Sequence, residues 1–140
     1  MEFGTYLFNS LRIGVKKQYR NRPVFSDGKL TPELYNYIKD SLYSDQFTHL
    51  YGCYNEDVMS IQVECENGLF YIVICNEMEG TSYTYLNYKN REDASLIDVG
   101  GSSISKKYIC EDKETIMKII ITFLTTGKPY DKCEWFKQIQ

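Results

Sequence analysis

The sequence predicts an α+β domain in which an antiparallel sheet of five to seven strands packs against two main helices. Three observations lead to this class. Short runs of strand-forming residues follow one another between residues 47 and 110. Apolar side chains recur at helical spacing in 32–43 and again in 111–126. A final strand-like run covers 134–139, and a chain of 140 residues suits one domain over residues 1–140.

The first 45 residues predict a strand, two turns and a helix. The strand is expected near 6–15, and Arg22-Pro23 and Asp27-Gly28 indicate turns. The tripeptide Thr31-Pro32-Glu33 then combines a capping residue, a proline suited to the first helical position and an acid at the positive end of the dipole. The helix is expected to end near Tyr43. Its apolar stripe consists of Leu34, Tyr37, Ile38 and Leu42.

An antiparallel meander is predicted for the middle of the chain. Residues 58–66 alternate between apolar and polar side chains, as a half-buried strand does. Asn67-Gly68 is a strong two-residue hairpin signal. The next run, 69–75, is apolar throughout, which predicts a central strand buried on both faces. The other strands of the meander are expected at 47–53, 81–88, 95–99 and 105–110.

The second helix has clear signals at both ends. Acids gather at its start, from Glu111-Asp112 onward, where they suit the helix dipole. Gly127 is expected to cap its end, and Pro129 prevents its continuation. The apolar stripe between these ends consists of Ile116, Ile119, Ile120, Phe123 and Leu124.

Charge is segregated along the chain in a way that predicts a basic partner. Residues 40–88 contain eight acids and no Lys or Arg, although the whole chain carries a net charge of only −3. Acids on a sheet with no cation among them favour a cationic protein. The thirteen tyrosines suit contact surfaces as well as half-buried sheet faces. The predicted contact residues are Glu56, Asp57, Glu64, Glu66, Glu77, Glu79, Tyr51, Tyr54, Tyr83 and Tyr85.

No pattern predicts a catalytic residue or a cofactor, so we expect a binding protein rather than an enzyme. His49 is the only histidine, and Cys53 lies four residues further on, about 13 Å away along an extended strand. The carboxylate pairs Glu64/Glu66 and Glu77/Glu79 lack the unlike environments that acid–base catalysis needs. Two alternatives stay open. One is a module whose Tyr-rich sheet binds a small molecule or serves as a scaffold, and the other is a small hydrolase built on His49 and Cys53.

Composition gives further expectations about ligands and compartment. The five cysteines include no closely spaced pair, so no metal site is expected. No run of about 18 apolar residues and no signal peptide are visible, so we expect a cytoplasmic protein that does not enter the membrane. The basic residues between Lys16 and Arg22 are few in an acidic protein, and nucleic-acid binding is therefore not expected.

The C-terminal third resembles a known family over about 45 residues. The resemblance rests on Asp98-Val99-Gly100-Gly101, on the helix Ile116–Pro129 with its Thr126-Gly127 ending, and on Cys133-Glu134-Trp135-Phe136. These segments look like the family numbered one among the immunity proteins of bacterial polymorphic toxins, which includes proteins of contact-dependent growth inhibition systems. The resemblance implies a protein that binds a cognate toxin domain, commonly a nuclease with a basic cleft, and covers its active site.

Overall fold

The computed structural model of the chain describes residues 7–15, 24–54 and 58–139. The elements run in the order β1 (Leu7–Val15), β2 (Val24–Lys29), α1 (Pro32–Leu42), β3 (Phe47–Tyr54), β4 (Met59–Glu66), β5 (Leu69–Asn76), β6 (Thr81–Leu86), the 3₁₀ turn η1 (Tyr88–Asn90), β7 (Leu96–Val99), β8 (Ser102–Ser105), the 3₁₀ turn η2 (Lys106–Tyr108), β9 (Ile109–Cys110), α2 (Lys113–Thr126) and β10 (Glu134–Ile139).

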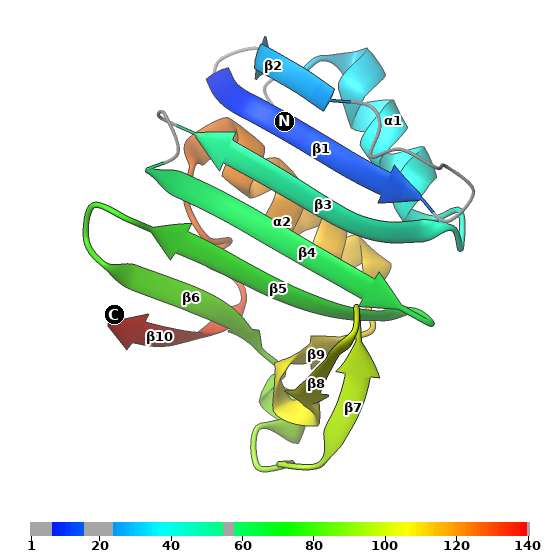
Figure 1. The fold of residues 1–140 in the computed structure, drawn as a ribbon, viewed down its shortest axis with the longest axis vertical. Helices are drawn as coiled ribbons and strands as arrows, with labels where there is room; N and C mark the ends of the chain where they lie inside the picture. Colours follow the sequence, from blue (N-terminus) through cyan, green and yellow to red (C-terminus); the bar gives the residue numbers. More distant parts are fainter. Residues whose placement is uncertain (1–6, 16–23, 55–57, 140) are drawn as a thin grey trace.

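One antiparallel sheet organises the described part of the chain. Seven strands follow the order β10-β6-β5-β4-β3-β1-β2, and the short β9 pairs with the first half of β5. β3 to β6 form a meander, since each pairs with its neighbour in sequence. β7 and β8 form a separate two-stranded hairpin at one end of this sheet (Figure 1). No helix in the described residues is long and apolar enough to cross a membrane.

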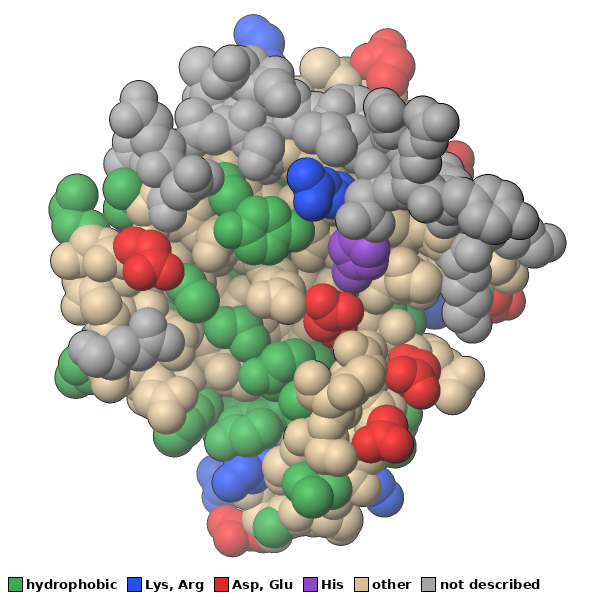
Figure 2. All heavy atoms as spheres, viewed as in Figure 1, with side chains coloured by type: hydrophobic (Ala, Val, Ile, Leu, Met, Phe, Trp, Pro, Cys, Tyr) green, Lys and Arg blue, Asp and Glu red, His purple; other side chains and the backbone are tan. Residues whose placement is uncertain are grey.

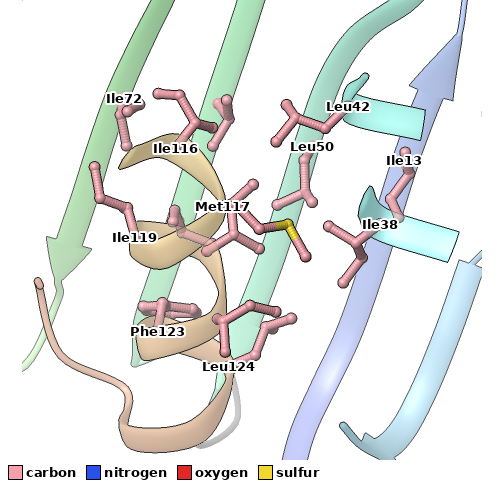
Figure 3. Packing of buried hydrophobic residues seen from close by; sticks show 14 of the residues in the cluster. Ile13, Ile38, Leu42, Leu50, Ile72, Ile116, Met117, Ile119, Phe123 and Leu124 are labelled. Carbon is pink, nitrogen blue, oxygen red and sulfur yellow. The ribbon is translucent and has the colours of Figure 1, made fainter. Parts of the chain in front are cut away.

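Both helices cover the same face of the sheet and enclose the core. In Figure 1 they lie behind the strands, so the other face of the sheet is turned toward the viewer. Alternate residues of β4 and β5 point toward the helices and are fully buried: Ile61, Val63, Ile72 and Ile74. They pack against the inner side of α2, which contributes Ile116, Ile119 and Phe123 (Figure 3).

The helix ends form as their sequence signals predict. The Thr31 hydroxyl accepts a hydrogen bond from the Leu34 N–H at 3.1 Å, and the Asp112 carboxylate accepts one from the Glu114 N–H at 3.1 Å. Each bond satisfies a backbone donor that the first turn of a helix leaves unpaired. Gly127 ends α2 with φ of 73°, in the left-handed region that glycine adopts without a steric penalty.

The predicted fold class is confirmed, and three local predictions are wrong. Asp27-Gly28 lies within β2 rather than in a turn. The predicted strand 105–110 is divided among the end of β8, η2 and β9. The run 69–75 is buried on one face only, because Tyr71 and Val73 on the other face stay partly exposed. The Arg22-Pro23 turn lies outside the described residues.

Candidate protein interface on the open face of the sheet

The face of the sheet opposite the helices is the candidate functional site. Side chains alternate along a strand, so the residues between the buried core positions point to this side. Register pairs them across strands: Tyr51 of β3 lies opposite Gln62 of β4, which lies opposite Val73 of β5. We call this surface the open face and define it by Arg12, His49, Tyr51, Gln62, Glu64, Glu66, Tyr71, Val73 and Phe136.

The open face has an apolar part and an acidic part. Figure 2 shows apolar side chains running across its middle, with one acidic side chain beside the single histidine near the centre and other acidic side chains toward the margins. Tyr51 and Phe136 are 42% and 43% exposed, which is high for large apolar side chains on a sheet. The Phe136 ring contacts that of Tyr108, with centroids 5.9 Å apart. This arrangement of an apolar centre and a polar edge is common in protein interfaces.

Glu64 and Glu66 lie at the end of β4 and have different local partners. The Glu64 carboxylate accepts a hydrogen bond from the Gln62 side chain at 3.1 Å, and Glu64 lies opposite His49 in the register. The Glu66 carboxylate accepts the backbone N–H of Gly100 at 3.1 Å and so ties the β7–β8 hairpin to the sheet. Neither carboxylate forms an ion pair with a described Lys or Arg.

Tyr71 shows that part of this face is shielded from water. Burial raises the pKa of the Tyr71 hydroxyl, although a hydrogen bond to Thr84 lowers it in part. Burial likewise raises the pKa of the neighbouring Cys75 thiol, with a further contribution from Glu77. Both groups therefore stay neutral at physiological pH and add to the apolar character of the surface.

The structure brings together only some of the predicted contact residues. Tyr51, Glu64 and Glu66 share the open face. Glu77 and Glu79 lie in the β5–β6 turn, at the other end of the strands and about 25 Å from Glu66. Glu56 and Asp57 lie outside the described residues.

The structure does not place the four tyrosines among the predicted contact residues on one face of the sheet. Tyr54, Tyr83 and Tyr85 point to the helix-covered side, where they pack partly buried against the core. The Tyr85 ring meets that of Trp135 edge-on at 6.2 Å, and burial raises the pKa of the Tyr85 hydroxyl. The Trp135 indole N–H donates to the Tyr130 carbonyl at 2.8 Å. The C-terminal motif is therefore a packing unit beside the helices.

His49 and Cys53 do not form the pair that a hydrolase would need. They lie four residues apart on β3, and register places His49 opposite Gly14 and Glu64 but Cys53 opposite Ser60. The His49 ring lies directly over Gly14, where a Cβ would collide with it, and its Nδ1 is 3.0 Å from the Thr48 hydroxyl. No group of three metal-binding side chains occurs among the described residues.

Sequence reasoning missed the apolar centre of the open face. Tyr71 and Val73 lie in a run that is apolar throughout, and such a run does not reveal which face is uncovered. The alternation in 58–66 was the available signal, because it predicts one polar face on the neighbouring strand. Comparison of the chain with protein-family models, with curated proteins and with solved structures found no match.

Proposed function

We propose that this protein is an immunity protein that binds a basic toxin domain through the open face and blocks its active site. The observation that carries the proposal is the uncovered sheet face, on which Glu64 and Glu66 border an apolar centre and pair with no described cation. A basic cleft would supply the missing counter-charges, and complementary charge would speed association. The resemblance of the C-terminal third to polymorphic-toxin immunity proteins supports the same function.

The size of the open face suits one protein partner. The open face runs over the six strands from β10 to β1, which at about 4.8 Å apart span about 24 Å, and eight residues of the central strands span about 26 Å. Their product, about 620 Å², approaches the roughly 800 Å² that each partner buries in a standard interface. The exposed aromatic residues Tyr51 and Phe136 are of the type that carries binding energy at such interfaces.

Charge reversal on the open face tests this proposal. A candidate basic toxin domain is titrated with Glu64→Lys, and the control is Asp40→Lys on the exposed side of α1. We expect Glu64→Lys to raise Kd at least about tenfold and to make the salt dependence of binding shallower, because an attractive ion pair is replaced by repulsion. Asp40→Lys should leave Kd within about twofold.

The fold of each variant is checked by circular dichroism, since Glu64 also crowds Gly100 at the start of the hairpin. Tyr51→Ala adds a test that does not depend on charge, and we expect it to weaken binding about tenfold through lost apolar contact. Equal affinities for Glu64→Lys, Tyr51→Ala and Asp40→Lys in folded protein would remove the open face from the interface.

A further inference from the structure

A groove of about 660 Å³ runs between α1 and α2 on the outer side of the helix layer, away from the open face. Three segments line it: the outer side of α1, the neighbouring side of α2 and the loop before β10. The lining residues that matter here are Tyr35, Lys39, Tyr43, Met117, Ile121 and Tyr130.

Helical spacing explains why these residues meet. Tyr35, Lys39 and Tyr43 are four residues apart, so they form one ridge along α1. Met117 and Ile121 have the same spacing on α2 and form the floor, each 6% exposed. Figure 3 shows Met117 directed from α2 toward Ile38 of α1, which closes the groove from below. The groove therefore has an apolar floor that joins the core cluster.

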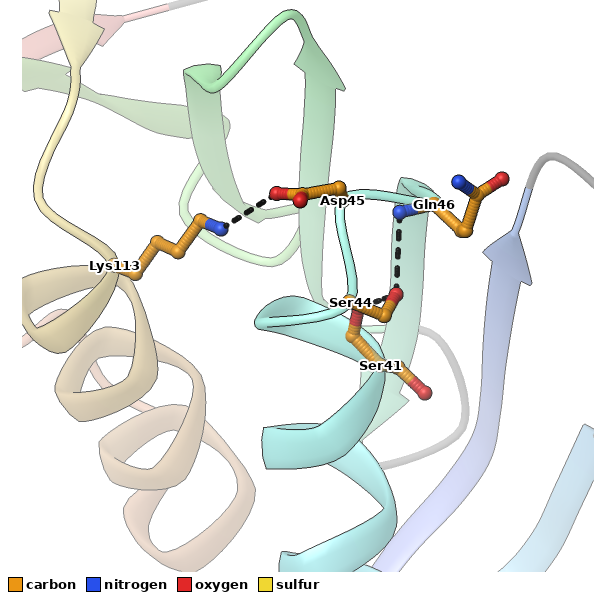
Figure 4. Close-up of polar contacts among 5 residues, drawn as sticks. All are labelled: Ser41, Ser44, Asp45, Gln46 and Lys113. Carbon is orange, nitrogen blue, oxygen red and sulfur yellow. Dashed lines mark hydrogen bonds and ion pairs between the residues drawn. The ribbon is translucent and has the colours of Figure 1, made fainter.

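Contacts are found at both ends of the groove. At one end the Lys113 ammonium lies 3.4 Å from the Asp45 carboxylate (Figure 4). The same ammonium lies 5.6 Å from the centre of the Tyr43 ring. At the other end lies Tyr130, in the loop before β10. Its backbone carbonyl accepts a hydrogen bond from the Trp135 indole N–H. The stretch of α2 that lines the groove, from Glu114 to Thr126, spans about 18 Å. The floor of buried side chains makes the groove a preformed site, as ligand pockets usually are.

The charges at the edge of the groove favour an anion. Lys118 lies 3.7 Å from Glu114, one turn away on α2, so these two charges offset each other. Among the described residues Lys39 forms no ion pair, although it stands on the wall of the groove. One cation is thus left without an opposite charge, next to an apolar floor.

We propose that this groove binds a small anionic amphiphile, whose apolar chain or ring lies on Met117 and Ile121 and whose carboxylate or sulfonate pairs with Lys39. The volume lies within the roughly 300–1,000 Å³ of small-molecule sites, and an apolar lining with few charged groups is typical of them. The groove and the open face lie on opposite sides of the sheet, so this inference is independent of toxin binding.

The test uses 1-anilinonaphthalene-8-sulfonate, a fluorescent probe with an apolar ring system and one sulfonate, and decanoate as a competitor. We expect saturable fluorescence with the native protein and displacement of the probe by decanoate. Lys39→Met should raise the probe's Kd about tenfold, and Thr122→Trp should abolish binding by filling the groove. The control Lys132→Met removes an exposed charge outside the groove and should change nothing.

Amide chemical shifts locate the probe independently of the variants. We expect shifts along α1 and α2 and none on β4. Shifts confined to the sheet, or equal Kd values for the native protein, Lys39→Met and Thr122→Trp with unchanged melting temperatures, would overturn the proposal. Displacement of the probe by an amphipathic helical peptide but not by decanoate would also overturn it, because the occupant would then be a protein segment.

Discussion

The two faces of the sheet are formed by the same strands but differ in what they contact. On the covered face Ile61, Val63, Ile72 and Ile74 are 0% exposed and pack against α1 and α2. One residue further along each strand, Gln62 and Val73 lie on the open face in contact with water. Alternate positions along a strand therefore either stabilise the fold or are available for binding. We expect the loss of unfolding free energy on substitution to alternate in the same way.

The largest contrast is expected between Phe70 and Val73. Phe70 is fully buried on the covered face, with its ring centroid 6.1 Å from that of Phe47. Phe70→Ala should lower the free energy of unfolding by about 3–5 kcal/mol, because it removes a buried ring and leaves a cavity. Val73→Ala, on the open face, should cost about 1 kcal/mol. Urea denaturation measures both, and equal losses would show that the open face is covered in solution.

Local signals predicted most of the fold. The Asn67-Gly68 pair adopts left-handed φ values of 53° and 77°, as a tight hairpin turn requires. Alternation in 58–66 identified both faces of β4, and the caps of α1 and α2 were visible as residue types. Each of these features depends on a few residues that are neighbours in the sequence, so it can be predicted from the sequence alone.

Features that depend on distant residues could not be predicted in this way. Tyrosine suits either face of a sheet, so nothing local indicates that Tyr83 and Tyr85 turn inward while Tyr51 turns outward. The apolar centre of the open face is visible only once the sheet order shows that both helices lie on the other side. The groove between α1 and α2 joins segments some eighty residues apart and has no sequence signal of its own.

A smaller contrast is expected between two cysteines at alkaline pH. Burial raises the pKa of the Cys133 thiol, on the covered side, from its ordinary value of 9.0 to about 11. The folded protein then holds this proton to a higher pH than the unfolded chain does. The stability associated with the neutral thiol is complete below pH 9 and is lost as the pH rises from about 9 to about 11.

Cys133→Ala measures this contribution by urea denaturation at pH 8 and pH 10. The native protein should lose more stability between the two pH values than Cys133→Ala does, by less than about 1 kcal/mol after screening by solvent. Cys75→Ala gives the same comparison on the open face, where burial also raises the thiol pKa, and should show a smaller difference. If Cys75→Ala changed the pH dependence of stability more than Cys133→Ala does, the thiol on the open face would be the more strongly buried one, against our expectation.

The smallest effect is expected at the Asp45–Lys113 ion pair beside the helices. The Asp45 side chain is 88% exposed, so water and salt screen its interaction with Lys113. Asp45→Asn removes the charge and keeps a residue type that tolerates the φ of 62° found here. We expect a loss below about 0.5 kcal/mol at low ionic strength and none in 1 M salt.

A double-mutant cycle of Asp45→Asn with Lys113→Met isolates the pair from other effects of each substitution. A coupling energy above about 1 kcal/mol would mean that the pair holds the two helices together, and α1 should then move when it is broken. A coupling energy near zero would agree with a helix side that is stabilised by apolar burial rather than by charge pairs. Charges on the helix side then add little to folding, and Glu64 on the open face forms no ion pair with a described Lys or Arg.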